Sequence, residues 1–180
     1  MSKIITKPEL TFTEALNEAK GKLVQFTGRS RRSEYWWCAL AVFVVNLVLG
    51  WIPLIGGVIS ILTGLTMIPL SFRRLHDSGH SGWWYGVSMI LGIVIFFLLM
   101  SLLVAAGLST DSNISFESLQ TILLSSSAII LIVLYLIGLI LGIVILVFLL
   151  QDSKPYPNKY GASPKYVMED ETAMSDFVEN

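Results

Sequence analysis

Three long stretches without Asp, Glu, Lys or Arg constrain this chain more than any other feature. They cover residues 35–72, 81–110 and 118–151. About 20 consecutive apolar residues are enough to cross the hydrocarbon core of a bilayer. Each stretch is longer than that, so the sequence predicts an integral membrane protein. The composition agrees, because 14% of the 180 residues are charged, whereas a soluble domain carries about 25%.

The first uncharged stretch is too long for one membrane span. As a single helix, residues 35–72 would measure about 57 Å, nearly twice the roughly 30 Å hydrocarbon core. Its centre contains Pro53 and the pair Gly56-Gly57, which is typical of a turn. Two short helices over 35–50 and 54–72 therefore fit better. A re-entrant hairpin that does not cross the membrane fully is the alternative.

Each of the other two stretches holds one span. A third helix is expected over 83–107, beginning at an aromatic run of the kind that settles at headgroup level. A fourth is expected over 122–150, longer than the bilayer needs, which suggests tilt. The predicted fold class is an all-α membrane protein with four transmembrane helices arranged as two hairpins. The segment 1–34 forms a cytoplasmic leader, and 151–180 forms a cytoplasmic tail with a disordered acidic end.

The positions of the cations predict the orientation. The turn near Pro53 and the loop 108–121 contain no Lys or Arg. Positive residues are retained on the cytoplasmic side, so four spans place both termini in the cytoplasm. The cations fall into three groups, before the first span, between the second and third, and after the fourth: Lys3, Lys7, Lys20, Lys22, Arg29, Arg31 and Arg32; Arg73 and Arg74; Lys154, Lys159 and Lys165.

The leader shows the pattern of an amphipathic helix. Thr11 and Glu14 have the spacing of a capping box at its start. Such a helix lies flat on the inner leaflet or packs on the protein's own cytoplasmic loops, and the sequence leaves both open. The apolar residues recur at steps of three and four, which gives one helical stripe: Phe12, Leu16, Ala19, Leu23 and Phe26.

The arginines and their neighbouring acids form the main candidate site. All five arginines flank the predicted membrane boundaries. Guanidinium groups match phosphate geometry, and each basic residue here adds about 1 kcal/mol of attraction to anionic lipid. These properties would suit a specific site for a lipid headgroup. The favoured interpretation is internal pairing of the arginines with nearby acids, together with general attraction to anionic lipid. The candidate residues are Arg29, Arg31, Arg32, Glu34, Arg73, Arg74, His76 and Asp77.

The histidines carry a weak metal-binding pattern. His76 and His80 have the i, i+4 spacing of a helical zinc motif, with Asp77 beside them. Gly79 and Gly82 favour a turn over a helix here, and the chain has no third His. We therefore expect no metal and no cofactor, and we expect Asp77 to cap the turn that follows.

Within the predicted spans there is no acid, Lys, Arg or His. Ion-coupled carriers generally place such groups at bilayer depth, so the sequence disfavours that mechanism. Gly138 and Gly142 in the fourth span allow close helix approach, which we expect to serve packing within the chain.

Three polar segments of the chain form one further pattern: residues 26–36 (FTGRSRRSEYW), 73–84 (RRLHDSGHSGWW) and 157–164 (PNKYGASP). Together they resemble the domain-of-unknown-function 805 family of bacterial inner-membrane proteins. The resemblance implies a helical inner-membrane protein without an assigned reaction or ligand. His80 stands where the family usually has Arg or Lys, and Ser163 stands where it usually has Asp. The first departure argues further against a metal site.

The sequence predicts a non-enzymatic membrane protein that acts by packing, by anionic-lipid contact or by partner binding. Its three family segments should meet in one polar network on the cytoplasmic face. The alternative is a small transporter or channel component. A more distant alternative is an interfacial enzyme that uses His76 and Asp77 as an acid–base pair, although no catalytic residue is assigned. Expected partners are anionic lipids and a membrane-protein partner or second copy, and no nucleic acid.

Overall fold

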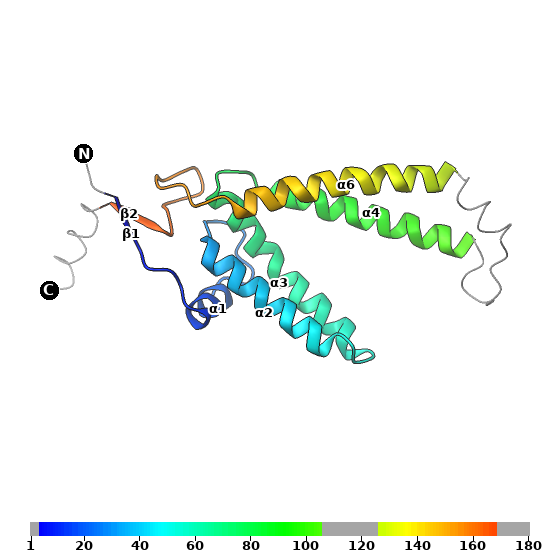
Figure 1. Cartoon of the computed structure of the whole chain (residues 1–180), viewed down its shortest axis with the longest axis horizontal. Helices are drawn as coiled ribbons and strands as arrows, with labels where there is room; N and C mark the ends of the chain where they lie inside the picture. The colour runs from blue at the N-terminus through cyan, green and yellow to red at the C-terminus, as the bar shows by residue number, and fades with distance from the viewer. Residues whose placement is uncertain (1–3, 106–125, 169–180) are drawn as a thin grey trace. The chain divides into compact units, whose positions relative to one another are not determined.

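The computed structural model describes residues 4–105 and 126–168. The loop expected over 108–121 and the acidic end of the tail lie outside these residues. The described chain contains five helices and two short strands (Figure 1). In chain order they are β1 (Ile4–Thr6), α1 (Phe12–Lys20), α2 (Arg32–Leu49), α3 (Ile55–Asp77), α4 (Trp83–Ala105), α6 (Ser126–Leu150) and β2 (Tyr166–Met168).

Four of the helices are long and apolar enough to cross a membrane. The candidate spans are Arg32–Leu49, Ile55–Asp77, Trp83–Val104 and Ala128–Leu150. Large apolar side chains on them, such as Phe43, are more than half exposed, as expected for surfaces that face lipid. The predicted all-α class with four candidate spans is therefore confirmed. Their arrangement as two hairpins across a bilayer stays a prediction.

The second span extends further than the sequence suggested. We expected it to end at residue 72 and the polar segment that follows to form a turn, but α3 continues to Asp77. That expectation was wrong for residues 73–77, because the helix ends only where glycine permits a left-handed residue. Gly79 has a φ of 85° and donates its N–H to the His76 carbonyl at 3.0 Å. His80 donates to the Leu75 carbonyl at 2.9 Å, which completes a Schellman motif.

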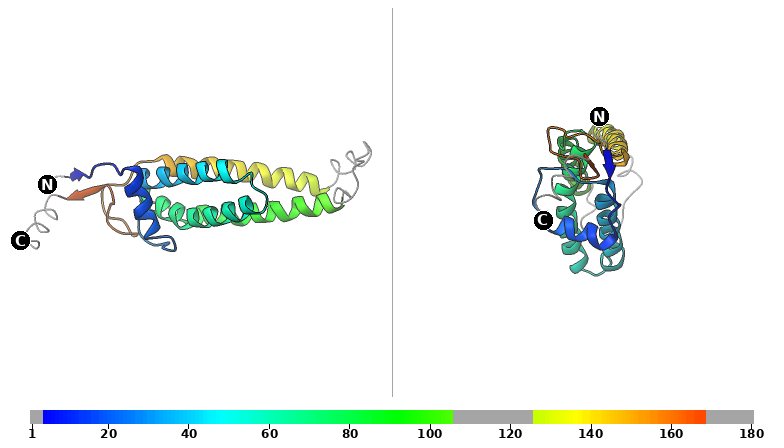
Figure 2. Two further views of the ribbon diagram at one scale, coloured as in Figure 1. Left: turned by 90° about the horizontal axis from the view of Figure 1, so that it is seen from below. Right: turned by 90° about the vertical axis from the view of Figure 1, so that its left-hand side faces the viewer.

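The chain forms two compact units, Met1–Gly82 with Phe148–Asn180, and Trp83–Val147. In the first unit, α2 and α3 pack along each other and are joined by the turn over 50–54 (Figure 2). Hydrogen bonds among three polar side chains, here called the polar clamp, link the two helices within their otherwise apolar contact. Asn46 donates to Thr63 Oγ1 at 3.0 Å and accepts from Ser60 Oγ at 2.6 Å.

Helix α1 packs against the start of α2. The predicted capping box is present, because the Thr11 N–H donates to Glu14 at 2.8 Å and the Glu14 N–H donates to Thr11 Oγ1 at 3.5 Å. Ala15 is fully buried, and the Trp37 indole donates to the Leu10 carbonyl at 3.1 Å. The helix ends at Lys20, which is before the last residues of the expected apolar stripe. Its placement relative to a bilayer stays a prediction.

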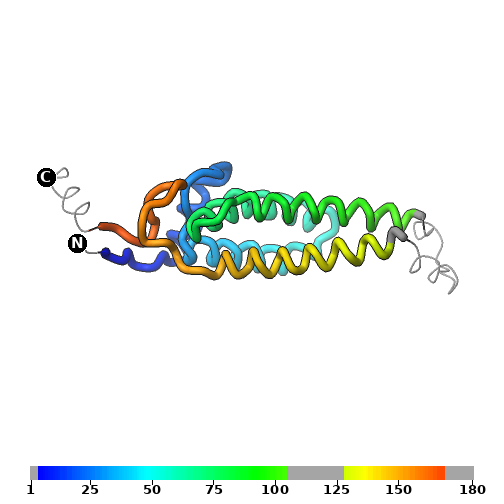
Figure 3. The backbone as a smooth tube through the Cα atoms, turned by 90° about the horizontal axis from the view of Figure 1, so that it is seen from above, coloured from blue at the N-terminus to red at the C-terminus, as the bar shows by residue number. Residues whose placement is uncertain are grey.

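The chain ends of the first unit are joined by a small sheet. Strands β1 and β2 pair antiparallel, with Ile4 opposite Met168, so the leader and the tail are tied together. In the second unit, α4 and α6 run side by side (Figure 3). Gly138 lies against Leu91 and Ile95 of α4, while Gly142 faces open space among the described atoms.

Candidate functional site, a buried arginine–carboxylate cluster

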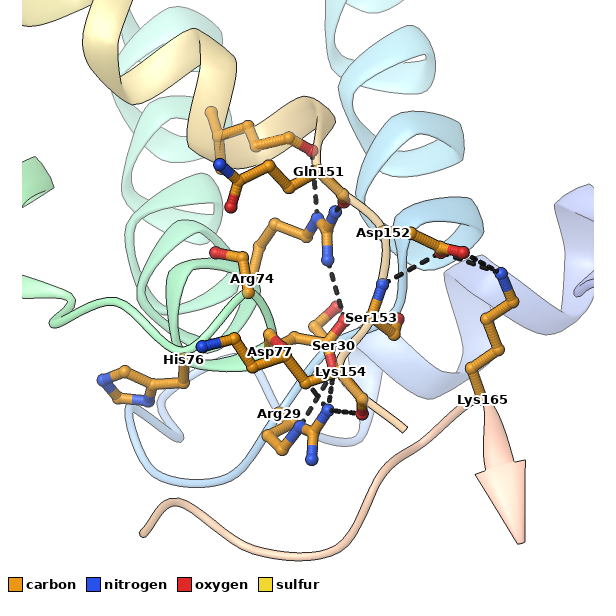
Figure 4. Close-up of polar contacts among 12 residues, drawn as sticks. Arg29, Ser30, Arg74, His76, Asp77, Gln151, Asp152, Ser153, Lys154 and Lys165 are labelled. Carbon is orange, nitrogen blue, oxygen red and sulfur yellow. Dashed lines mark hydrogen bonds and ion pairs between the residues drawn. The ribbon is translucent and has the colours of Figure 1, made fainter. Parts of the chain in front are cut away.

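Asp77, the last residue of α3, is fully buried and receives hydrogen bonds from three side chains (Figure 4). Its Oδ1 accepts from Arg29 Nε at 2.9 Å. Its Oδ2 accepts from Arg74 Nη1 at 2.7 Å and from Ser153 Oγ at 2.5 Å. We call these four residues the Asp77 cluster. One carboxylate thus joins the segment before α2, the end of α3 and the start of the tail.

Arg29 also holds the tail through its backbone. Its Nη1 donates to the carbonyls of Tyr156 and Gly161 at 3.1 and 3.3 Å. Its Nη2 donates to the carbonyls of Lys154 at 2.5 Å and of Asp77 at 3.4 Å. With the bond to the Asp77 carboxylate these acceptors number five. A guanidinium carries five N–H donors, so Arg29 is saturated.

Arg74 caps the end of α6 in a similar way. It donates from Nε to the Leu149 carbonyl at 3.1 Å and from Nη2 to the Gln151 carbonyl. The last carbonyls of a helix have no partner within the helix, and a cation there is favourable. Arg74 therefore supplies both the donors and the charge that this helix end needs, and Asp77 balances part of the charge.

Glu34 and Arg73 form a second, looser buried pair. Arg73 Nη1 lies 3.4 Å from Glu34 Oε1, and both residues are 1% exposed. Glu34 Oε2 accepts from Ser30 Oγ at 2.7 Å, and the Ser30 N–H donates to the Arg73 carbonyl at 3.1 Å. In contrast to Arg29, Arg73 leaves its Nε and Nη1 without a hydrogen-bond partner in the described structure.

The two histidines lie in different surroundings. The His76 ring stacks on Tyr160 at 3.7 Å between centroids, and its Nδ1 lies 3.2 Å from the Gly28 carbonyl. The His80 ring stacks on Phe148 at 3.7 Å. Burial, with the Lys154 cation as a second cause, lowers the pKa of His80. The described ranges contain no group of three or more His, Cys, Asp or Glu side chains that could hold a metal.

One predicted role was wrong. Asp77 does not cap the turn after it, because its carboxylate oxygens accept hydrogen bonds from the two arginines and Ser153 instead. The remaining two arginines lie apart from the Asp77 cluster. Arg31 is buried and donates to the Lys7 carbonyl at 3.4 Å, whereas Arg32 is exposed.

A surface pair fixes the tail further along. Lys165 Nζ lies 2.5 Å from Asp152 Oδ2, and Tyr166 donates to the same carboxylate at 3.2 Å. Burial alone would raise the pKa of Asp152, but hydrogen bonds from Lys165 and the Ser153 N–H outweigh burial and lower it. The pair holds the approach to β2 beside the end of α6.

The sequence did not single out four side chains that complete this site: Ser30, Ser153, Asn158 and Tyr160. Asn158 donates to the His76 carbonyl at 2.9 Å. Asn158 and Tyr160 lie in the tail segment of the family resemblance, which was the available signal for them. Ser30 lies in the first segment of that resemblance, residues 26–36, whereas Ser153 lies in none of the three segments and nothing in the sequence distinguishes it.

Comparison with known proteins agrees with this architecture. Residues 23–117 match the family model described as a protein of unknown function, DUF805. Inner membrane protein YhaI of Escherichia coli K12 is 41% identical over 69 residues, which is 34% of this chain and 58% of the relative. Inner membrane protein YhaH of the same organism is 41% identical over 73 residues, which is 34% of this chain and 60% of the relative.

The aligned part therefore spans about three fifths of each of these relatives. No solved structure matches the chain. The family match covers more than half of the chain and includes both the leader arginines and the loop after α3, which confirms the resemblance seen in the sequence. This membrane protein belongs to the DUF805 family, whose matched relatives are inner membrane proteins.

Proposed function

We propose that the chain is a non-enzymatic inner-membrane protein whose cytoplasmic face is a preformed platform for anionic lipid or a protein partner. The observation that carries this proposal is the saturation of Arg29 by five protein acceptors. Because every N–H of Arg29 already has a protein acceptor, Arg29 cannot also donate a hydrogen bond to a lipid phosphate. Arg29 and Arg74 therefore serve the structure by holding the tail against the end of α3.

Lipid contact is then made by the described cations that are exposed, namely Lys7, Lys20, Arg32, Lys154 and Lys159. Each adds about 1 kcal/mol of attraction to an anionic leaflet. The sorting of all twelve cations onto alternate loops supports a cytoplasmic position for both termini. A second copy or another membrane protein is the kind of partner that a mostly exposed apolar surface would accept.

The geometry around His76 supports a non-enzymatic role. An acid–base pair needs the carboxylate and the imidazole to be within reach of a substrate. Asp77 is fully buried and its oxygens accept from Arg29, Arg74 and Ser153. The His76 ring is covered by Tyr160.

The polar groups within the first helix pair support packing over transport. Asn46 bonds to Thr63 and Ser60 across the two helices. Thr63 and Thr66 also donate to carbonyls of their own helix, at 2.8 and 2.7 Å. These groups satisfy one another, so they do not need the water or solute of a transport path. A small transporter or channel component is thus the weaker alternative.

Limited proteolysis tests the platform. Trypsin cleavage after Lys159 should accelerate in Asp77→Asn, because the tail loses its central acceptor. The acceleration should be about tenfold for each 1.4 kcal/mol taken from the local opening energy. Asp152→Asn, which removes only a surface pair, should accelerate cleavage far less than Asp77→Asn. Equal cleavage rates in wild type and Asp77→Asn would contradict a tail held by this cluster.

A further inference from the structure

A cavity of about 290 Å³ lies where α1 crosses α2 and α3. Its walls are largely apolar and include Leu16, Ala19, Leu23, Ala41, Val42 and Leu70. Two charged residues, Arg73 and Lys20, and the hydroxyl-bearing Thr66 also line it. Lys20 is exposed, and Arg73 is 1% exposed. The cavity therefore combines an apolar interior with one buried and one accessible cation.

The buried cation lacks the acceptors that its neighbours have. Arg29 has five, whereas two nitrogens of Arg73, Nε and Nη1, have none in the described structure. Glu34 Oε1, at 3.4 Å, is beyond good hydrogen-bond geometry and is itself unsatisfied. Buried donors almost always have a partner, and an exception calls for a ligand, ion or water. Arg73 thus marks the polar end of a binding site.

The positions of Arg73 and Cys38 along their helices indicate which ligand can reach the cavity. Arg73 is four residues before the end of α3, which is about 6 Å along the axis. Cys38, on the cavity wall, is six residues after the start of α2, which is about 9 Å. The headgroup layer of a bilayer is about 5–7 Å thick on each side. With these ends of α2 and α3 placed at the bilayer surface, Arg73 lies near phosphate and glycerol level, and the apolar interior lies at the level of acyl chains.

We propose that this cavity holds part of one acyl chain of an anionic phospholipid, with its phosphate accepting from Arg73 and facing Lys20. A volume of about 290 Å³ is at the lower end of small-molecule sites, about 300–1,000 Å³. It fits a segment of one chain, while the rest of the lipid stays in the leaflet. Glu34 balances the charge of Arg73, so Lys20 supplies the net positive charge that selects an anionic head. This inference rests on the proposed contact of the cytoplasmic face with anionic lipid.

Native mass spectrometry of the full chain released from nanodiscs tests the site. The nanodiscs contain phosphatidylcholine with phosphatidylglycerol, and oleate is added in a parallel sample. Wild type should retain one phosphatidylglycerol per chain. Ala41→Phe, which fills the cavity from α2 and leaves Arg73 itself unchanged, should abolish retention. Its control is Ala39→Phe, two residues away on α2 and not on the cavity wall; this variant should bind as wild type does.

Arg73→Gln should weaken phosphatidylglycerol retention about tenfold or more, the usual effect of losing a hydrogen bond to a charged group. Equal retention in Ala41→Phe and Ala39→Phe would overturn the site. Equal retention of phosphatidylcholine would overturn the charge preference, and retention of oleate in place of phospholipid would overturn the lipid class. Ala41 is not a member of the Asp77 cluster, so a negative result here leaves the proteolysis result on the platform unaffected.

Discussion

Arg29 and Asp77 are separated by 48 residues, yet Arg29 Nε lies 2.9 Å from Asp77 Oδ1 and both side chains are almost completely buried. Removing either partner would leave a buried charge without compensation, which is costly. Because Arg29 also binds three tail carbonyls, the same contact couples the leader, the end of α3 and the tail.

Arg29→Lys should destabilise the protein although it keeps the charge. A lysine offers three donors from one atom and cannot reach acceptors that surround a planar guanidinium. We expect a loss of about 2 kcal/mol, the scale of one or two hydrogen bonds to a charged group. Thermal melting in detergent measures it. Arg32→Lys, at an exposed position, should change stability by less than about 0.5 kcal/mol, and equal melting of both variants would count against the saturation of Arg29.

The sequence predicted the four candidate spans, because these follow from where charges are absent. It also named Glu34 and Asp77 as counter-charges for the arginines, without saying which arginine each would meet. It did not predict that Arg29 and Arg74 bind mainly backbone carbonyls, since every residue offers a carbonyl and the sequence does not mark which are unpaired. The continuation of α3 to Asp77 was also missed. Gly79 and Gly82 both suggested a turn, but only the left-handed Gly79 ends the helix.

Asn46→Leu should weaken the packing of α2 on α3. The substitution keeps the size but removes the bonds to Thr63 and Ser60. Interhelical hydrogen bonds in membranes contribute about 0.6–2 kcal/mol, so the melting temperature should fall modestly. Val44→Leu, on the exposed surface of the same helix, is the control. Unchanged melting of Asn46→Leu would show that the clamp adds little to stability.

Cysteine-accessibility labelling in a Cys38→Ser background tests the orientation. Lys159→Cys should label only from the cytoplasm, because all twelve cations sort to that side. Leu54→Cys, in the turn between α2 and α3 and 91% exposed, should label from outside. Ser78 is 1% exposed and would make a poor probe. Protection of Leu54→Cys from labelling would point to a re-entrant hairpin over 35–72.

The Asp152–Lys165 ion pair should stabilise the fold only between the pH at which Asp152 is protonated and the pH at which Lys165 is deprotonated. The pKa of Asp152 is lowered below 3.8, so its contribution is present above that value and is lost as the pH falls through the folded pKa. The pKa of Lys165 is raised above 10.5, chiefly by its hydrogen bond to Asp152. Its contribution is present below 10.5 and is lost as the pH rises through the raised value.

Asp152→Asn should therefore cost at most about 1 kcal/mol at neutral pH, as exposed pairs do. The melting difference from wild type should stay constant between about pH 5 and pH 9 and vanish in stronger acid. A difference that increases toward low pH would mean that Asp152 stabilises the fold in its protonated form.

The melting temperature of Asp77→Asn, with and without added cardiolipin, tests the central claim most directly. The structural interpretation of the Asp77 cluster predicts a large loss, about 3–5 kcal/mol for breaking a fully buried pair. It also predicts that cardiolipin does not restore the loss, and that Asp152→Asn melts close to the parent. If Asp77→Asn instead melts like the parent and binds cardiolipin more tightly, the arginines of this cluster serve phosphate rather than the fold.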